Sequence, residues 1–284
     1  MQRILVPTDF SKQAENALQT AVIIASKFNA KIFLLHVLVV SSQNRVNSLS
    51  TKETDPRVAE KLLIDESIQE AKSNIERSLL LHDVEKSGVS VESFIRIGNP
   101  IKEIERSVEN SNIDLVIMGT KGAWGLNDIL LGTNTDKLLR RVNCPVMAVN
   151  QIIPIEDYKK IVFPTTTNSK ETNLIEIIKN LQQAFESKIH LVRINTPSDF
   201  IPDEESIELL NEYAEENSLK NYETHVYSHN EEEDGIREFA RSINAGLIAV
   251  STSAHTGLRK IIQGSVTKDL VSHSKRPVLT MKMD

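Results

Sequence analysis

The sequence contains almost no cysteine. Its one cysteine, Cys144, cannot form a disulfide within the chain, so a packed core must stabilise the fold without covalent crosslinks. A single cysteine fits a reducing compartment, and we therefore expect a cytoplasmic protein. Cys144 precedes Pro145 in a segment that leads into an apolar run, which favours a structural role for its thiol over a reactive one.

The sequence also lacks long apolar runs and an excess of positive charge. No apolar run approaches the roughly 18 residues of a membrane span, and the first residues, MQRILVPTDFS, lead into a strand without the regions of a signal peptide. The formal net charge of -6 disfavours nonspecific binding to nucleic acid or to an anionic membrane. We therefore expect neither nucleic acid nor membrane among the partners.

Sequence motifs of dedicated enzymes are absent as well. There is no nucleophile elbow, no Ser/His/Asp order with distinctive spacing, and no Walker lysine followed by Ser or Thr. The seven histidines are scattered, and no Cys/His cluster has the spacing of metal ligands. The sequence therefore predicts no catalytic residue and no metal ligand, and it favours a binding module over an enzyme.

The residues that are present predict an α/β fold. With 284 residues, 40% of them hydrophobic, the chain has the length of two ordinary domains. In the first half, five short apolar runs alternate with helical patterns, which predicts an open parallel sheet with helices on both faces. The expected strands are Arg3 to Pro7, Lys31 to Val40, Val89 to Ile97, Leu115 to Met118 and Pro145 to Val149.

A long helix is expected between the second and third of these strands. Its pattern begins at Pro56 and continues to about Lys86. Apolar residues recur along it at helical spacing, and we expect them to face the core. These residues are Val58, Leu62, Leu63, Ile68, Ala71 and Ile75.

The second half of the sequence repeats the first. YKKIVFPTTTNS matches MQRILVPTDFS, with Pro164 standing 157 positions after Pro7. Near the end of each half the offset is 132 positions, between Pro145 and Pro277, so the second copy is shorter. This tandem duplication predicts two five-stranded domains, 1–150 and 151–284. The strands expected in the second are Lys160 to Pro164, Lys188 to Ile194, Tyr222 to Tyr227, Leu247 to Val250 and Pro277 to Met281.

One stretch, from Asp114 to Asn134, has the pattern of an anion-binding loop. It reads DLVIMGTKGAWGLNDILLGTN: an apolar strand ends at Gly119 and Gly122, and Gly132 and Thr133 open a helical pattern. Glycines allow backbone N–H groups to approach a phosphate, and a helix N-terminus offers unpaired donors. A surface loop followed by an N-capped helix is the alternative, and the residues alone leave both open.

A second candidate for ligand contact lies at the end of the first strand. Asp9 follows Pro7 and Thr8 there, and Ser11 reads as the N-cap of the next helix. In an open parallel sheet, ligands bind at the carboxyl edge of the strands. Asp9 is therefore a candidate contact, with a turn or capping aspartate as the open alternative.

Three motifs together resemble those of the universal stress protein family in its tandem-domain form. They are VPTDFS at the start, GNP before a helix, and Gly119-x2-Gly122-x9-Gly132-Thr133 before the last strand. The resemblance covers essentially the whole chain and implies a Rossmann-like, adenine nucleotide alpha hydrolase-like fold that binds ATP, with Mg²⁺ left open as a companion. The contacts implied are Gly119, Lys121, Gly122, Gly132, Thr133, Asn134 and Thr135 at the phosphates, and Pro7, Thr8, Asp9 and Val37 at the adenosine portion.

The second half departs from this pattern. Thr166 and Ser251 stand where the first half has Asp9 and Gly119, and Ala254 replaces the second glycine. A side-chain carbon then occupies each point of phosphate approach, so we expect ATP to bind in the first half. The resemblance thus implies an ATP-binding protein with a regulatory or stress-response role. Two alternatives stay open: an interaction or scaffold protein without a nucleotide, and a slow ATP hydrolase.

The last strand of each half is short and apolar. Strands of this kind, Pro145 to Val149 and Pro277 to Met281, are poor edges to leave in solvent. We expect them to pair with each other, which would make the chain an intramolecular pseudo-dimer. Any further homodimer would then form through other surfaces.

Overall fold

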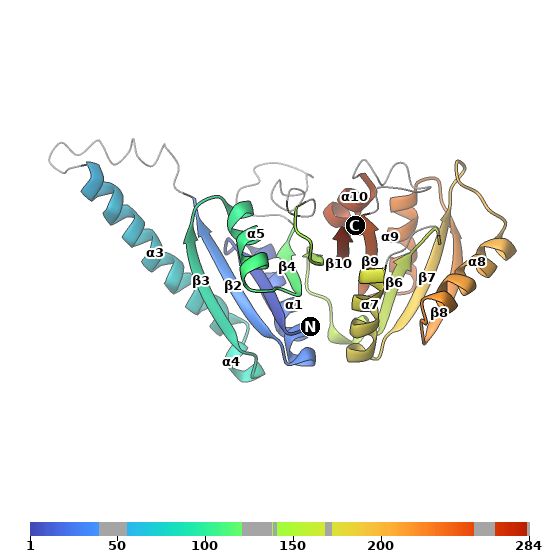
Figure 1. Ribbon diagram of the computed structural model, residues 1–284, viewed down its shortest axis with the longest axis horizontal. Coiled ribbons are helices and arrows are strands. Elements are labelled where there is room, and N and C mark those ends of the chain that lie inside the picture. The colour runs from blue at the N-terminus through green and yellow to red at the C-terminus, as the bar shows by residue number, and fades with distance from the viewer. Residues whose placement is uncertain (40–55, 121–137, 139–140, 168–171, 253–264, 283–284) are drawn as a thin grey trace.

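The computed structural model describes residues 1–39, 56–120, 138, 141–167, 172–252 and 265–282, and its strands form one ten-stranded sheet (Figure 1). The first half contributes β1 (Arg3–Thr8), β2 (Lys31–Leu38), β3 (Val91–Ile97), β4 (Leu115–Gly119) and β5 (Val146–Val149). The second half contributes β6 (Lys160–Pro164), β7 (Lys188–Asn195), β8 (Tyr222–Ser228), β9 (Leu247–Thr252) and β10 (Val278–Lys282). The spatial order is β3-β2-β1-β4-β5-β10-β9-β6-β7-β8.

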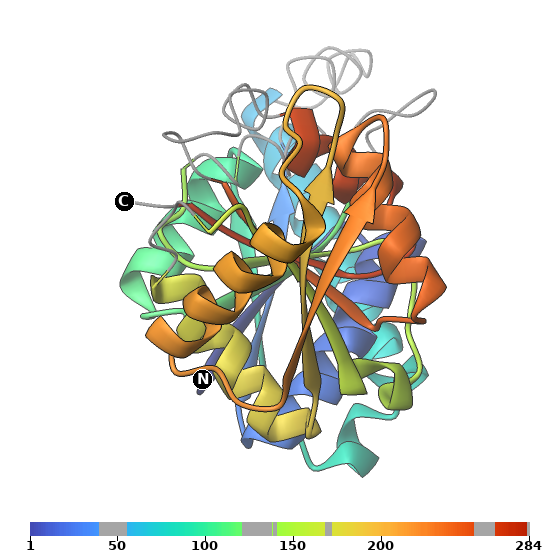
Figure 2. The same ribbon diagram turned by 90° about the vertical axis from the view of Figure 1, so that its right-hand side faces the viewer.

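Within each half the neighbouring strands are parallel, as the alternation of strands and helices predicts. Figure 2 looks at the sheet from the side of β8 and shows its strands fanning out with the usual twist. The α/β fold expected from the sequence is therefore confirmed.

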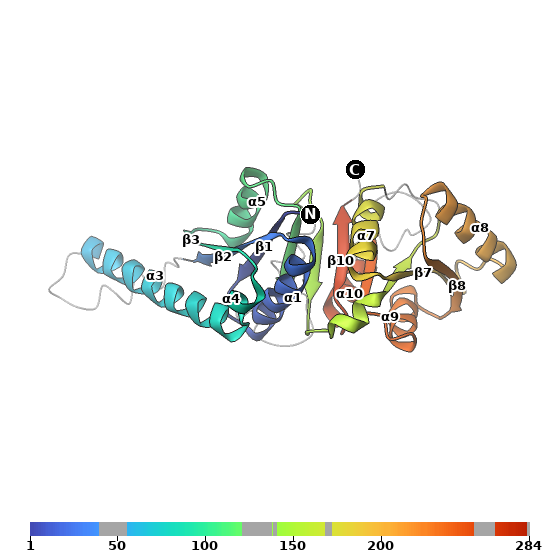
Figure 3. The same cartoon turned by 90° about the horizontal axis from the view of Figure 1, so that it is seen from below.

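Helices lie on both faces of this sheet (Figure 3). The described ones are α1 (Lys12–Phe28), α3 (Pro56–Leu81), α4 (Val84–Ser87), α5 (Pro100–Asn110), α7 (Thr172–Phe185), α8 (Asp203–Glu216), α9 (Glu232–Ser242) and α10 (Ser265–His273), with the 3-10 helix η1 (Ile155–Lys159) between the halves. Among the residues that the structure describes, no helix has both the length and the apolar character needed to cross a bilayer.

The largest cluster of buried apolar side chains runs through both halves of the molecule. It packs α1, α3, α7 and α8 against one face of the sheet, whereas α5 and α9 cover separate clusters on the other face. Tyr158 of η1 is 2% exposed in the shared cluster, and its ring stacks on Phe185 at 5.0 Å between centroids. The linker between the halves is thus itself part of the core.

Helix α1 owes its close packing to small residues and two polar caps. Ser11 is extended, and its hydroxyl accepts a hydrogen bond from the N–H of Ala14. Ala17 and Ala21 are fully buried, which lets the helix backbone lie close to the sheet. The helix ends at Asn29, whose left-handed conformation is one that asparagine tolerates.

The two halves meet along β5 and β10, which pair antiparallel as expected for the last strand of each half. Met147 lies opposite Leu279, and neither side chain is exposed to solvent. Asn150 follows β5 directly and donates from Nδ2 to the carbonyls of Ser274 (2.8 Å) and Val271 (3.3 Å) at the end of α10. Backbone pairing, apolar contact and a side-chain amide therefore all join the halves at this seam.

The long helix departs from its prediction in two respects. Asp83 adopts a left-handed conformation, so α3 stops at Leu81 and the short α4 follows. Ala71 and Ile75 are buried as expected, and Ile68 is half-buried. The expectation that Val58, Leu62 and Leu63 also face the core is wrong, because they are 49%, 55% and 42% exposed. Figure 1 gives the reason: the first turns of α3 project past the strands, where no sheet lies beneath them.

The seam generates the first prediction, which tests whether the halves behave as an intramolecular pseudo-dimer. Met147→Lys places an unpaired charge at a fully buried position of the seam. We expect it to lower the free energy of unfolding by about 3–5 kcal/mol, in one transition that includes both halves. The measurement is urea denaturation, with hydrogen exchange resolved along the chain to follow each half.

Met147→Leu is the matched control, because a swap of similar volume should cost less than about 1.5 kcal/mol. Separate unfolding of the halves in the unmodified protein would contradict the prediction.

Candidate functional site

The strand order of the first half reverses between β1 and β4, and we call the space outside the carboxyl ends of these two strands the crevice. From β1 the sheet continues to β2 on one side and to β4 on the other, so the strand order reverses at this point. Ligands in open α/β sheets bind at the carboxyl ends of the strands where such a reversal occurs. Thr8 ends β1 and Gly119 ends β4, which places the two predicted segments on opposite sides of one crevice.

Asp9 lies at the mouth of this crevice and is partly buried. Its Oδ1 accepts a hydrogen bond from the N–H of Ser11 at 3.0 Å. The turn role that the sequence left open for Asp9 is therefore present. This bond fixes the carboxylate at the start of α1, beside the carboxyl end of β1, and the ligand role stays a prediction.

Two rings lie side by side at the carboxyl ends of β1 and β2, where Phe10 packs against the cluster that α1 covers. The Phe10 and His36 rings lie 4.5 Å apart between centroids, and His36 Nδ1 is 2.8 Å from the carbonyl oxygen of Thr8. Val37 is the next residue of β2, and it is half-buried. Because side chains alternate along a strand, Val37 faces the opposite side of the sheet from His36 and packs with the cluster of Leu35 and Ile101.

Gly119 has a structural reason to be glycine. A Cβ added there would lie 2.7 Å from the carbonyl carbon of Gln13 and 2.9 Å from the backbone nitrogen of Ala14. Atoms cannot approach this closely without a shift, so Gly119 lets the first turn of α1 approach β4. Its phosphate role stays a prediction.

The predicted contacts divide between described and undescribed residues. The structure places Pro7, Thr8, Asp9, Val37 and Gly119 at the carboxyl edge of β1, β2 and β4. The other predicted contacts lie outside the described residues: Lys121, Gly122, Gly132, Thr133, Asn134 and Thr135.

The second half repeats the turn that follows β1 with different side chains. Thr167 has a φ of 65° and donates its N–H to Thr165 Oγ1 at 3.0 Å, as Phe10, with a φ of 61°, donates to Thr8 Oγ1 at 3.1 Å. The same turn therefore recurs 157 positions later, which confirms the register of the duplication. Between the two threonines stands Thr166, where the first half has Asp9.

The structure also brings together a set of side chains that the sequence did not reveal. His190, Glu223 and His225 each offer a ligand atom within 4.8 Å of the others. Burial lowers the pKa of His190 to about 4 and also lowers that of His225, so both rings are neutral near pH 7. The histidines looked scattered because 35 positions separate them along the chain.

Cys144 has the environment of a structural residue. It is 7% exposed, and burial raises the pKa of its thiol to about 12. The reactive thiolate is therefore disfavoured at neutral pH.

Comparisons with known proteins agree on one family. The model of the universal stress protein family matches residues 1–150 and 157–282. Universal stress protein MJ0577 of Methanocaldococcus jannaschii is 31% identical over 161 residues, which cover 53% of this chain and 95% of that protein. A crystal structure of a universal stress protein from Archaeoglobus fulgidus covers 99% of this chain and 98% of its own, with a TM-score of 0.73 at 19% identity. A universal stress protein solved in complex with cAMP covers 53% and 97%, with a TM-score of 0.38 at 22% identity.

Gly119→Ala tests the packing role of this glycine. The added methyl would meet the backbone of α1, so we expect a loss of about 1–3 kcal/mol in the free energy of unfolding. Because the clash lies within the protein, the loss should already be present in thermal melts without ATP. A variant of unchanged stability would show that α1 and β4 do not require glycine here.

Proposed function

The chain belongs to the universal stress protein family, whose role is in stress response, and on that premise we propose that it binds one molecule of ATP in its first half. The observation that carries the proposal is the position of two residues on opposite sides of one crevice: Asp9 follows β1, and Gly119 ends β4. These are the two positions at which the second half has Thr166 and Ser251. The halves share a fold, so the loss of the Asp9 carboxylate in the second half changes the ligand chemistry while the scaffold is retained.

The described part of the crevice suits the adenosine portion of the nucleotide. Val37 offers apolar surface for a base, on the face of the sheet that also carries Leu35. Asp9 offers a carboxylate, which accepts hydrogen bonds from ribose hydroxyls or from an exocyclic amine. The sequence of the glycine motif that follows β4 supplies the phosphate end, since its backbone N–H groups suit an anion. Mg²⁺ would be held largely through the phosphates, as is usual for this ion.

We propose binding and regulation, with no turnover, as the function. Phosphoryl transfer needs a residue that orients the attacking group, and the sequence offers no motif of that kind. A protein whose conformation depends on bound ATP can instead report the nucleotide state of the cell to a partner.

The number of sites is the first test. Calorimetric titration with ATP and Mg²⁺ should give a stoichiometry near one per chain. Two sites would show that the second half retains binding, and the absence of binding would favour the scaffold alternative. Phosphate release measured in the same sample separates binding from slow hydrolysis.

Asp9→Asn tests the assigned carboxylate. Asparagine keeps an oxygen that can accept from the N–H of Ser11, so the turn at the start of α1 should persist. Losing the charge weakens a hydrogen bond to the ligand, and we expect ATP affinity to fall about tenfold. Thr166→Ala, at the equivalent position of the second half, is the matched control and should leave affinity unchanged. Equal affinity in all three proteins would remove Asp9 from the site.

A further inference from the structure

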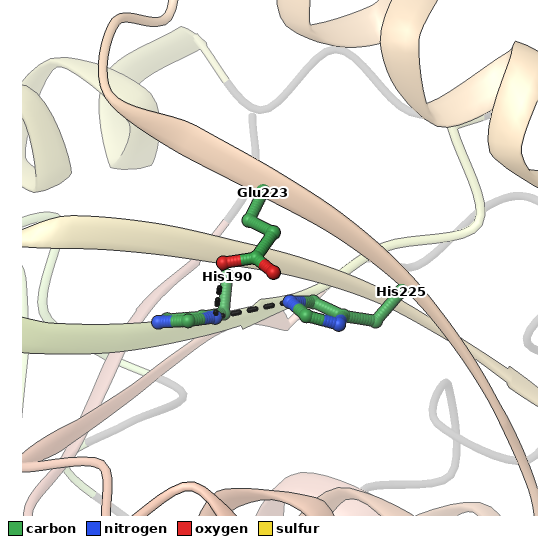
Figure 4. A group of neighbouring side chains, drawn as sticks. All are labelled: His190, Glu223 and His225. Atoms are coloured by element: carbon green, nitrogen blue, oxygen red, sulfur yellow. Dashed lines mark hydrogen bonds and ion pairs between the residues drawn. The ribbon is translucent and has the colours of Figure 1, made fainter.

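Two strands at the outer edge of the second half carry a cluster of His190, Glu223 and His225 (Figure 4). The register of β7 and β8 pairs His190 with Glu223 and Val192 with His225. Side chains two positions apart on a strand share a face, so all three point to the same side of the sheet. Figure 4 shows the carboxylate of Glu223 above the two rings, whose nitrogens face each other.

The distances within this cluster match those between ligands of one metal ion. His190 Nδ1 lies 3.0 Å from His225 Nε2 and 4.0 Å from Glu223 Oε2. Two nitrogens bound to one zinc ion at about 2.0–2.1 Å stand about 2.8–3.4 Å apart for bond angles between octahedral and tetrahedral values. The two imidazoles therefore already have the required separation. Glu223 is exposed, so its side chain can move closer without repacking the core.

The equivalent positions in the sheet of the first half carry no histidine. Phe33 pairs with Glu92, and Leu35 pairs with Phe94, in the register that His190, Glu223 and His225 occupy in the second half. The rings of Phe33 and Phe94 are stacked, with centroids 6.1 Å apart. The flanking ion pair is retained as well: Lys31 contacts Glu92 at 2.6 Å, and Lys188 contacts Glu223 at 3.4 Å.

This internal comparison shows that the fold does not require histidine at either place. An apolar ring pair fills the equivalent positions of the first half, where it packs with the core. His190 is 6% exposed, and among the described residues its Nε2 has no hydrogen-bond partner. Burying that nitrogen costs free energy that phenylalanine would not. Both aromatic positions are nevertheless histidine in the second half, beside a carboxylate, so the second half has ring nitrogens there that packing does not require.

We propose that His190, His225 and Glu223 form a Zn²⁺ site, a binding activity distinct from that of the nucleotide crevice. Two imidazoles and one carboxylate suit a borderline divalent ion such as Zn²⁺ and disfavour Mg²⁺ and Ca²⁺, which prefer oxygen ligands. Water fills the remaining coordination position, on the exposed side where Glu223 lies. The ion links the edge strand β8 to β7 and so stabilises the outer edge of the second half.

Positive charge near the cluster limits the affinity. Lys188 holds the Glu223 carboxylate in an ion pair, and both Lys188 and Lys160 act electrostatically on His190. Zn²⁺ must displace the lysine from the carboxylate before all three ligands can bind. Lys188→Gln should therefore tighten Zn²⁺ binding, and weaker binding in this variant would overturn the assignment of Glu223 as a ligand.

The test is a Zn²⁺ titration of the full chain, freed of metal and nucleotide, in competition with a chromophoric chelator. We expect one Zn²⁺ per chain. Glu223→Gln should weaken binding at least about tenfold, because it removes one of three ligands. Hydrogen exchange in β8 should slow when Zn²⁺ is added. His229→Gln is the matched control: His229 stands just beyond β8, outside the cluster, and its variant should bind as the unmodified protein does.

The double variant His190→Phe/His225→Phe provides the sharpest comparison. It installs the ring pair that the first half already uses, so the chain should fold and lose Zn²⁺ binding while ATP binding is unchanged. No binding of Zn²⁺ by the unmodified protein, or equal binding by the double variant, would overturn the proposal. If the double variant fails to fold, Glu223→Gln decides the question, because the Glu223 side chain is exposed.

Discussion

The antiparallel contact of β5 with β10 is the constraint on which the rest of the structure depends. Each half alone would expose a short apolar strand at its edge, and pairing the two strands removes both edges at once. The pairing also merges the cores, since one apolar cluster extends from α1 through the seam to α8. Because Tyr158 of the linker is buried in that cluster, the connection between the halves is fixed in place as well.

The sequence predicted the parts of the fold that depend on local pattern. Apolar runs predicted the strands, and helical spacing predicted the helices. The offset of 157 positions matched Thr8 with Thr165, which form equivalent turns in the two halves. The prediction of burial failed where burial depends on whether another element packs against the helix face. The spacing of Val58 and Leu62 on α3 is that of a buried face, but the sheet does not extend beneath them.

The candidate site shows the same division. The sequence placed Asp9 and Gly119 at the ends of β1 and β4, and parallel pairing brings both to one edge. It could not show that Gly119 makes room for the backbone of α1, because that contact depends on how closely a helix lies against a strand. Nor could it show that His190 faces His225, since the register of β7 with β8 determines that contact. Both contacts join residues that meet only after the sheet has formed.

Asn150 links the carboxyl end of β4 to the second half. Its backbone carbonyl accepts from Asn16 Nδ2 at 2.9 Å, on the helix that begins beside Asp9. Its side-chain oxygen accepts from the hydroxyl of Thr120, the residue after Gly119, and its amide group donates to the end of α10. One residue is therefore hydrogen-bonded to α1, to the residue that follows β4 and to the end of a helix of the other half. A displacement of Thr120 relative to α1 would strain this set of hydrogen bonds, so the geometry at the end of β4 depends mechanically on the second half.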